Sequence, residues 1–383
     1  METPVVLRLS RGAAVSVAAG HPWVYREDAR AVPCGTPVTL VDGRDRPLGW
    51  GVADEGSIAV RVLGHGAPRP LPRLLAERVH RADTARVRLV GPDTDAYRVV
   101  SGPGDGVPGL VVDRYGALAV LRIYSHAWQV HLRAVVDAVA ALPWVTTVAR
   151  RLGVTRVDGQ SGLTVLSGPE PSVSLVVTER GVRHIVRPHT GQKTGMFLDQ
   201  RVHRRLVGEW AAGRTVLNLF AYTGGFSVCA ALGGAARVTT VDLAPEAIAD
   251  ARENFRLNGL DPVHHGFEVA DAFHFTPPDR PDLWVVDPPS LARRQRSEGA
   301  ARTAYRRLHA RLAPLVPRDG LLASSSCTAR MSAEEWALAV ESGLASAGAW
   351  SWHWRSGAPP DHPVAVGHPE GHYLKFGLLR RRG

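Results

Sequence analysis

Glycines and a carboxylate stand at the ends of two apolar segments in the second half of the chain. Residues 215–219, T-V-L-N-L, have the composition of a strand buried on both faces, and a small-residue turn with Gly224 and Gly225 follows them. Such a turn lets a ligand approach the backbone beside a helix N-terminus. The next predicted strand, 237–241, ends in Asp242, and an acid at that place commonly accepts hydrogen bonds from ribose hydroxyls. We therefore expect a nucleoside-bearing cofactor.

Two further acids follow predicted strands downstream. The carboxylate of Asp271 comes where it could reach an adenine amino group, and an apolar strand at 283–286 runs into Asp287, Pro288 and Pro289. Two prolines after a carboxylate fix a rigid exit from the strand. Asp287 is therefore expected at the edge of the sheet, beside a flat substrate base.

The glycine turn alone does not choose between cofactors. Its sequence A-Y-T-G-G-F is not G-x-G-x-x-G, and the distance to Asp242 would suit NAD as well. The full order of parts, from this turn through Asp242 and Asp271 to Asp-Pro-Pro, resembles a class I S-adenosylmethionine-dependent methyltransferase. In such families the Asp-Pro-Pro site is typical of enzymes that methylate nucleobases.

A thiol is expected near the same edge of the sheet. Residues 321–323 read as a buried strand, three serines extend it, and Cys327 follows. A thiolate there could act as a nucleophile toward a substrate base. Cys229 lies in an Ala-rich helix that faces probable core, and Cys34 lies in a Pro-Cys-Gly turn. Three scattered cysteines favour a reducing cytosol without disulfides, and the sixteen histidines lack metal-ligand spacing, so no metal is expected.

The chain should contain more than one domain. Its 383 residues exceed a single domain of ordinary size, and short strand-like segments separated by turns fill residues 5–63. A helix from about 73 and several strands follow before the catalytic region. We predict an α/β protein with a β-rich domain at 1–70, a central α+β domain at 71–185 and a Rossmann-like domain at 186–383.

The charge favours a polyanionic partner. The net charge is +10, and all basic residues are arginine except Lys193 and Lys375, which suggests that a compact ammonium is preferred there.

A polar segment at 182–203 is interpreted as a lid over cofactor and substrate. An arginine cluster after Asp287 could clamp phosphates or could be a solvated helix face; it comprises Arg293, Arg294, Arg296, Arg302, Arg306, Arg307 and Arg311. No apolar run is long enough to span a membrane, and we expect a cytoplasmic protein.

Motifs along nearly the whole chain look like one family, the bacterial 23S ribosomal RNA cytosine-C5 methyltransferases with an N-terminal PUA domain. They are G-H-P-W-V-Y at 20–25, G-D-G-V-P-G-L-V-V-D-R-Y-G at 104–116, G-Q-K-T-G-M-F-L-D-Q-R at 191–201, N-L-F-A-Y-T-G-G-F at 218–226, D-P-P at 287–289, S-C at 326–327, and D-H-P-V at 361–364 with P-E-G at 369–371. The resemblance implies a PUA RNA-binding module, a central α/β domain and a catalytic domain with a seven-stranded mixed sheet. Met196 departs from the aromatic residue more usual there, and Thr328 makes Ser-Cys-Thr of the usual Ser-Cys-Ser.

Roles carried over by matching motif complete the expected site. Cys327 and Asp287 would be catalytic. S-adenosylmethionine would contact Gln200, Tyr222, Gly224, Asp242, Asp271 and Asp287. Lys193, Arg201 and Pro288 would meet the substrate, ribosomal RNA. Two alternatives remain: an enzyme that methylates a base nitrogen or a small molecule, which would leave Cys327 idle, and a catalytically silent RNA-binding assembly factor. The target nucleotide and the oligomeric state, a homodimer included, stay open.

Overall fold

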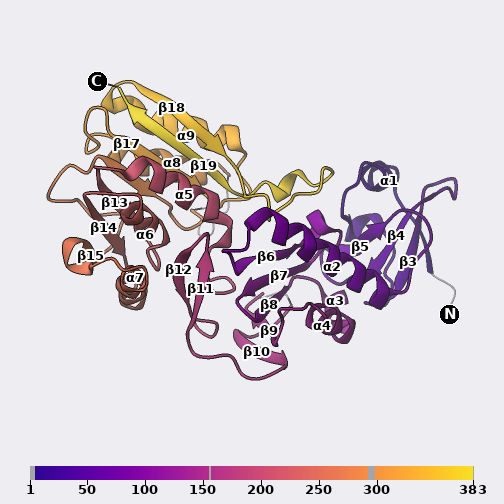
Figure 1. Cartoon of the computed structure of the whole chain (residues 1–383). Helices are drawn as coiled ribbons and strands as arrows, with labels where there is room; N and C mark the ends of the chain where they lie inside the picture. Colours follow the sequence, from indigo (N-terminus) through magenta and orange to yellow (C-terminus); the bar gives the residue numbers. More distant parts are fainter. Residues whose placement is uncertain (1–4, 155–156, 292–297, 383) are drawn as a thin grey trace. The chain divides into compact units, whose positions relative to one another are not determined.

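The computed structural model describes residues 5–154, 157–291 and 298–382, and its chain divides into two compact units (Figure 1). The first unit holds residues 1–181, Val186–Leu198 and Pro360–Gly371, and the second holds Val182–Ile185, Asp199–Pro359 and His372–Gly383. The three-domain division with boundaries at 70 and 185 stays a prediction.

The N-terminal part of the first unit is a five-stranded sheet of order β1-β3-β4-β5-β2. Its strands are β1 (Val5–Arg8), β2 (Trp23–Tyr25), β3 (Pro37–Val41), β4 (Pro47–Ala53) and β5 (Ile58–Gly64). A helix that the sequence reading missed, α1 (Arg11–Ala18), begins where the Ser10 hydroxyl accepts a hydrogen bond from the Ala13 N–H. Ala13 and Val17 on this helix enter the core of the sheet.

A second five-stranded sheet, of order β10-β9-β8-β7-β6, forms the rest of this unit's core. Its strands are β6 (Ala96–Ser101), β7 (Leu110–Tyr115), β8 (Leu118–Ile123), β9 (Thr147–Leu152) and β10 (Gly162–Ser167), with helices α2 (Leu71–Val90), α3 (His126–Val130) and α4 (Leu132–Ala140). β8 and β10 were not predicted. Trp50 and Leu63 of the N-terminal sheet share one core with Leu74 and Leu75 of α2, so the two sheets are not independently packed. A two-stranded sheet of β11 (Leu175–Glu179) and β12 (Val182–Val186) follows.

The second unit is built on a seven-stranded mixed sheet of order β15-β14-β13-β16-β17-β19-β18. Its strands are β13 (Thr215–Leu219), β14 (Arg237–Asp242), β15 (Gly266–Val269), β16 (Leu283–Val286), β17 (Leu321–Ser326), β18 (Trp350–Ser356) and β19 (Lys375–Arg381). Five strands are parallel, and β19 runs antiparallel to both β17 and β18. β13 lies between β14 and β16, which confirms the predicted central strand, and the doubly wound α/β fold class is confirmed with it.

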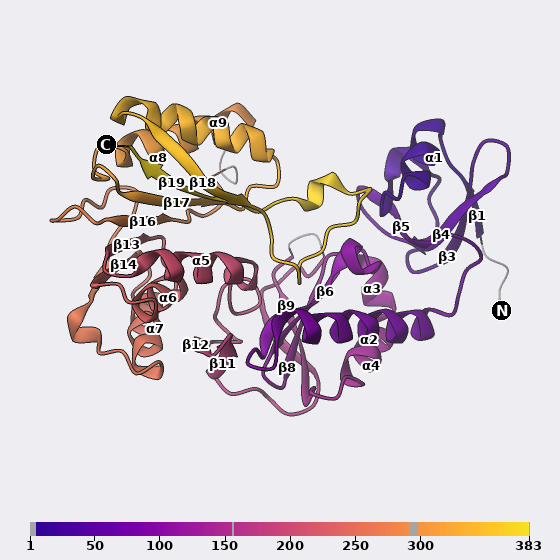
Figure 2. The ribbon, with the colours of Figure 1, turned by 45° about the horizontal axis from the view of Figure 1, so that its top comes forward.

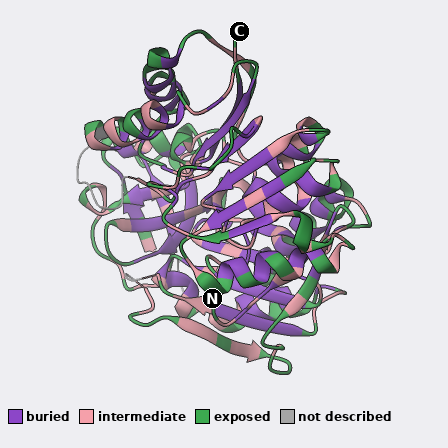
Figure 3. Cartoon of the chain, turned by 90° about the vertical axis from the view of Figure 1, so that its left-hand side faces the viewer, coloured by how far each residue is buried: buried purple, intermediate pink, exposed green. Residues whose placement is uncertain are grey.

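Helices cover both faces of this sheet because side chains along its strands alternate between two cores (Figure 2). Leu217 and Leu219 enter the core shared with α8 (Glu298–Leu312) and α9 (Ala333–Leu344). Val216 enters the opposite core, which is shared with α5 (Arg201–Ala211), α6 (Gly225–Leu232) and α7 (Pro245–Leu257). The central strands β13, β16 and β17 are accordingly buried along most of their length (Figure 3), whereas the edge strand β18 has no buried residue. The carboxyl ends of the parallel strands therefore meet at one edge, where open α/β sheets bind ligands.

Candidate active site

The turn after β13 is held in an uncommon backbone conformation. Phe220, Tyr222 and Gly224 have φ angles of 59°, 49° and 72°. A side-chain-bearing residue in this left-handed region costs about 1–3 kcal/mol, and such residues cluster at ligand sites. The turn is secured by hydrogen bonds: the Tyr222 N–H donates to the Asp242 carboxylate at 2.7 Å, and the Asn254 amide donates to the Thr223 carbonyl at 2.8 Å.

Asp242 lies at the end of β14 with its carboxylate directed at this turn. One oxygen accepts the Tyr222 N–H, and the other accepts the Ala244 N–H at 3.0 Å. A carboxylate offers about four lone-pair positions, so each oxygen keeps acceptor capacity. The next residue, Leu243, is 70% exposed. Leu243 was not among the site residues predicted from the sequence. Its position directly after Asp242 was the one signal that could have pointed to it.

The helix after the turn begins without a side-chain cap. Gly224 is the N-cap residue of α6, and the side chains that the structure describes give the first N–H groups of the helix no capping oxygen. In the first turn of α6, the Ser227 hydroxyl accepts hydrogen bonds from the Asn218 amide and the Thr240 hydroxyl, both at 2.9 Å. These bonds fix α6 to β13 and β14. The sequence therefore places a rigid, electropositive helix end beside Asp242.

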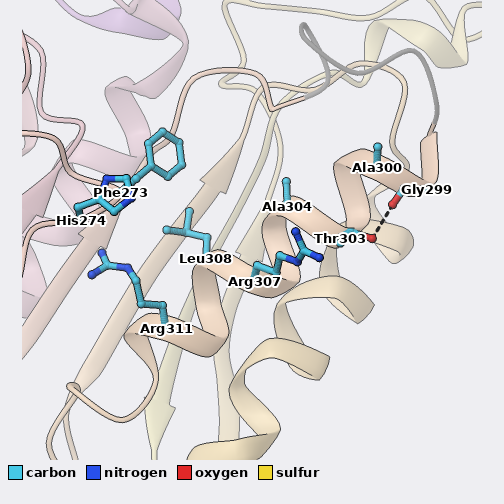
Figure 4. Close-up of a pocket in the computed structure, with 9 residues that line it drawn as sticks. All are labelled: Phe273, His274, Gly299, Ala300, Thr303, Ala304, Arg307, Leu308 and Arg311. Atoms are coloured by element: carbon cyan, nitrogen blue, oxygen red, sulfur yellow. Dashed lines mark hydrogen bonds between the residues drawn. The ribbon is translucent and has the colours of Figure 1, made fainter.

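Asp271 follows β15 and is exposed. Its carboxylate accepts hydrogen bonds from the Phe273 N–H at 2.9 Å and from His274 Nδ1 at 2.8 Å, and the His274 contact is the main reason why the pKa of Asp271 lies below its usual range. Arg311 on α8 holds this loop by donating to the carbonyls of Phe275 and Ala272. A pocket of about 580 Å³ lies between the loop and α8, lined by Phe273, His274, Gly299, Ala300, Thr303, Ala304, Arg307, Leu308 and Arg311 (Figure 4).

Asp287 follows β16 at the same edge and is held by two side chains. The Gln200 amide donates to one oxygen at 3.0 Å, and the Ser325 hydroxyl donates to the other. The Gln200 carbonyl in turn lies 2.5 Å from His203 Nδ1, and His203 Nε2 lies 3.0 Å from the Ser356 hydroxyl. Burial lowers the pKa of His203 to about 3, so the ring is neutral and its Nδ1–H donates to Gln200.

Sequence reasoning identified Gln200 and missed its partners. Ser325 lies 125 positions from Gln200 in the sequence, and Ser356 lies 153 positions from His203. No sequence motif marks these residues. The spacing of Gln200 and His203, three positions or about one helical turn apart, was the only available signal.

Cys327 directly follows β17, the strand paired with β16, and is half-buried. Tyr305 on α8 approaches the same segment, with its hydroxyl 3.4 Å from that of Thr328. Burial raises the pKa of Tyr305 to about 12, so the phenol is neutral. Cys327 therefore follows the strand whose Ser325 is bonded to Asp287.

The three predicted substrate residues differ in exposure. Arg201 is buried at the start of α5, Pro288 is buried and Lys193 is half-buried. Lys193 lies in the first unit, with its ammonium 4.3 Å from the centre of the Phe197 ring. Of the arginine cluster, Arg302, Arg306 and Arg307 are exposed on α8 and Arg311 is half-buried; Arg293, Arg294 and Arg296 lie outside the described residues.

The segment interpreted as a lid is not a free hairpin. β12 ends at Val186, and the Arg151 guanidinium donates to the carbonyls of Pro188 and Gly191 in the loop that follows. The Met196 N–H donates to the Tyr115 hydroxyl at 3.1 Å, and the Met196 side chain is buried in the core of the first unit. Met196 therefore packs in a core.

Membrane-spanning helices and metal clusters are both absent from the part of the chain that the structure describes. No helix among these residues is long and apolar enough to cross a membrane. Within the same residues, no group of three or more His, Cys, Asp or Glu side chains could hold a metal ion.

A doubly wound sheet with acids at successive strand ends and a glycine turn is typical of proteins that bind a nucleoside-bearing cofactor. Residues 122–366 match the S-adenosylmethionine-dependent methyltransferase family, and residues 7–65 match the PUA-like domain. The chain therefore belongs to the S-adenosylmethionine-dependent methyltransferases, with an N-terminal PUA-like domain. S-adenosylmethionine, the cofactor predicted from the sequence, is confirmed.

Similar proteins extend over the whole chain. The Ribosomal RNA large subunit methyltransferase of Deinococcus radiodurans is 40% identical and covers 98% of this chain and 97% of its own. Ribosomal RNA large subunit methyltransferase I of Klebsiella pneumoniae is 32% identical over 96% of each. A crystal structure of a methyltransferase complexed with SAH has a TM-score of 0.87 and 25% identity, covering 98% of this chain and 100% of that one.

Proposed function

We propose that the protein transfers a methyl group from S-adenosylmethionine to C5 of a cytosine in large-subunit ribosomal RNA, through a covalent bond between Cys327 and C6. The observation that carries this proposal is the position of Cys327 directly after β17, whose Ser325 donates a hydrogen bond to Asp287. A nucleophile and a carboxylate that can bind the base thereby lie on paired strand ends. The relatives named as ribosomal RNA large subunit methyltransferases support the choice of RNA.

The residues along the sheet edge fit the cofactor. Asp242 has acceptor capacity for ribose hydroxyls beyond the two N–H groups it binds, and the uncapped start of α6 suits a carboxylate. Asp271 is exposed and would accept from the adenine amino group, while Leu243 offers an apolar contact to the ring. Tyr222, Gly224 and Gln200 would complete the cofactor site. When bound, S-adenosylmethionine supplies an electrophilic methyl group on a sulfonium.

The chain's own residues would carry the remaining chemistry. The Cys327 thiolate adds to C6, which breaks the conjugation of the ring and places enamine density on C5. N3 would take up a proton from solvent as the thiolate adds, and the Asp287 carboxylate, held by Gln200 and Ser325, would accept a hydrogen bond from that protonated N3. C5 would then take the methyl group, which leaves S-adenosylhomocysteine, and would lose its own proton to a base. The C6–S bond would break to release the thiolate, and the N3 proton would return to solvent. Asp287 thus binds the base while Cys327 activates it.

The rest of the chain would bind and position RNA. The domain boundaries at 70 and 185 would separate a PUA-like RNA-binding domain, a central domain and the methyltransferase domain. Lys193, Arg201 and Pro288 are proposed to meet the substrate, and exposed arginines of α8 would contact phosphates.

The test is to map methylated nucleotides in ribosomal RNA from a strain that lacks this protein and from its parent. We expect one 5-methylcytosine of the large-subunit RNA to disappear and to return when the gene is restored. Loss of a methyl group from a base nitrogen instead would contradict the proposal and would leave Cys327 without a role.

A further inference from the structure

Lys375, at the start of β19, is the second of only two lysines among 46 basic residues and is almost fully buried, with 2% of its surface exposed. A buried ammonium is costly unless it is bonded or paired with a negative charge. Its Nζ donates to the carbonyls of Thr328, at 2.5 Å, and Tyr373, at 3.2 Å. Because carbonyls only accept, Nζ is the donor in both contacts.

The ladder between β17 and β19 brings this ammonium to Cys327. Lys375 is the register partner of Ser326, the residue before Cys327, and its Nζ binds the carbonyl of Thr328, the residue after it. The lysine side chain therefore reaches from one neighbour of Cys327 to the other. A compact ammonium suits such a narrow position beside backbone carbonyls, whereas the planar guanidinium fork used elsewhere in this chain is bulkier.

Charge provides the second link between the two residues. Burial lowers the pKa of Lys375 to about 8, and negative charge on the Cys327 thiol acts in the opposite direction and raises it. The interaction is mutual, so an ammonium that is stabilised by a thiolate stabilises that thiolate equally. Glu335 on α9 also raises the pKa of Lys375, although its carboxylate is bonded to the Ser332 N–H in the helix cap.

Two other ionisable groups near Cys327 do not supply a positive charge. Asp287 contributes a carboxylate, which would oppose a second negative charge, and Tyr305 is neutral because burial raises its pKa to about 12. A free thiol, with a pKa near ~8.5, is only a few per cent ionised at neutral pH. A nearby cation would raise the ionised fraction of a thiol at this site.

We propose that the Lys375 ammonium is a positioning residue that holds Cys327 in the thiolate form. This inference rests on the proposed function, because it explains how the proposed nucleophile is ionised. It assigns a role to a residue that the motif comparison did not include.

The test measures the ionisation of Cys327 without methylation. The full-length protein is treated with iodoacetamide between pH 5.5 and 9.5, and alkylation of each cysteine is followed by mass spectrometry. We expect the Cys327 midpoint to lie below ~8.5 in the wild type and to rise by about one unit in Lys375→Met, so that alkylation at pH 6.5 slows about tenfold. Arg133→Gln, which removes an exposed positive charge in the first unit, should leave the midpoint unchanged.

Binding of S-adenosylhomocysteine shows whether Lys375→Met is folded. An unchanged Cys327 midpoint in the folded variant, or an equal shift in Arg133→Gln, would overturn the inference. If Lys375→Met does not fold, a wild-type midpoint at or above ~8.5 overturns it and a lower one supports it. The proposed function fails separately, through a Cys327→Ala protein that still methylates RNA, whatever the thiol titration shows.

Discussion

The side-chain amide of Gln200 donates a 3.0 Å hydrogen bond to the carboxylate of Asp287, 87 positions away in the sequence. Gln200 is the N-cap residue of α5, and its own carbonyl accepts from His203 in the first turn of that helix. The carboxylate of Asp287, which is proposed to bind the base, is therefore oriented by the N-cap residue of α5, a helix that comes before the glycine turn in the sequence.

Replacing Gln200 with alanine should reduce the methylation rate. The substitution leaves one Asp287 oxygen and His203 Nδ1–H without this partner, at a cost of about 1–3 kcal/mol, and lets the carboxylate turn away. We expect a ten- to hundredfold fall in the single-turnover rate on RNA. Gln129→Ala is the matched control, because Gln129 also makes a side-chain hydrogen bond, to the Val157 carbonyl in the first unit. Equal rates for wild type and Gln200→Ala would contradict the role.

Replacing Asp242 with alanine should weaken cofactor binding. The change removes the acceptor proposed for the ribose and also the two backbone hydrogen bonds that secure the turn. We expect titration calorimetry to show S-adenosylhomocysteine binding at least tenfold weaker. Asp261→Ala is the control, since Asp261 accepts the Val263 N–H in a similar local turn. Unchanged affinity in Asp242→Ala would exclude Asp242 from the pocket.

Acid should destabilise the methyltransferase unit through two buried histidines. Burial lowers the pKa of His203 to about 3 and that of His309 to about 4. In the unfolded chain both histidines take up a proton as the pH falls below ~6.5, the usual histidine pKa, whereas in the folded chain they stay neutral. The free energy of unfolding therefore falls as the pH drops from ~6.5 toward 4. Each histidine contributes a slope of about 1.4 kcal/mol per pH unit.

Denaturant unfolding at several pH values checks this slope. His309→Gln removes one of the two titrating groups, so its free energy of unfolding, although lower at pH 7, should depend less on pH between 7 and 5. An unchanged pH dependence would mean that His309 does not stay neutral in the folded protein.

The positions of the strand-end acids were predictable because they are local in sequence. Thr215 to Leu219 form a buried run, and Asp242, Asp271 and Asp287 each come at or just after the end of a strand, so parallel topology alone brings them to one edge. The central strand was identified for the same reason. The α1 helix was missed because Ala13 to Gly20 is a short, weakly patterned segment beside a β-rich region.

Contacts between distant residues were not predictable from one sequence. Neither the Asp287–Gln200 hydrogen bond nor the His203–Ser356 hydrogen bond has a local sequence pattern. Lys375 stood out only by composition, and its meaning depends on the register of β19 against β17. That strand lies after the Pro- and Gly-rich segment 357–371, which hides its connection to the sheet.

Exposed arginines on α8 should contribute to RNA affinity by binding phosphates. Arg306 and Arg307 are exposed there, and an arginine that no longer binds a phosphate should reduce the slope of log affinity against log salt by about 0.7–0.9. We expect Arg306→Gln with Arg307→Gln to weaken binding and to flatten this slope by about one to two. Arg133→Gln, a similar exposed change where the guanidinium pairs with Asp137, should have no such effect. An unchanged slope would indicate that this face of α8 is solvated and does not bind RNA phosphates.

The most direct test of the central claim uses RNA that carries 5-fluorocytosine at the target position. Fluorine at C5 cannot leave as a proton does, so the C6–S bond should persist after methyl transfer and the RNA should remain attached to the protein. We predict a covalent complex, stable to denaturation, with the wild type and with Cys229→Ala. Cys327→Ala should bind S-adenosylhomocysteine normally and form no such complex. A Cys327→Ala protein that still methylates RNA would contradict the account.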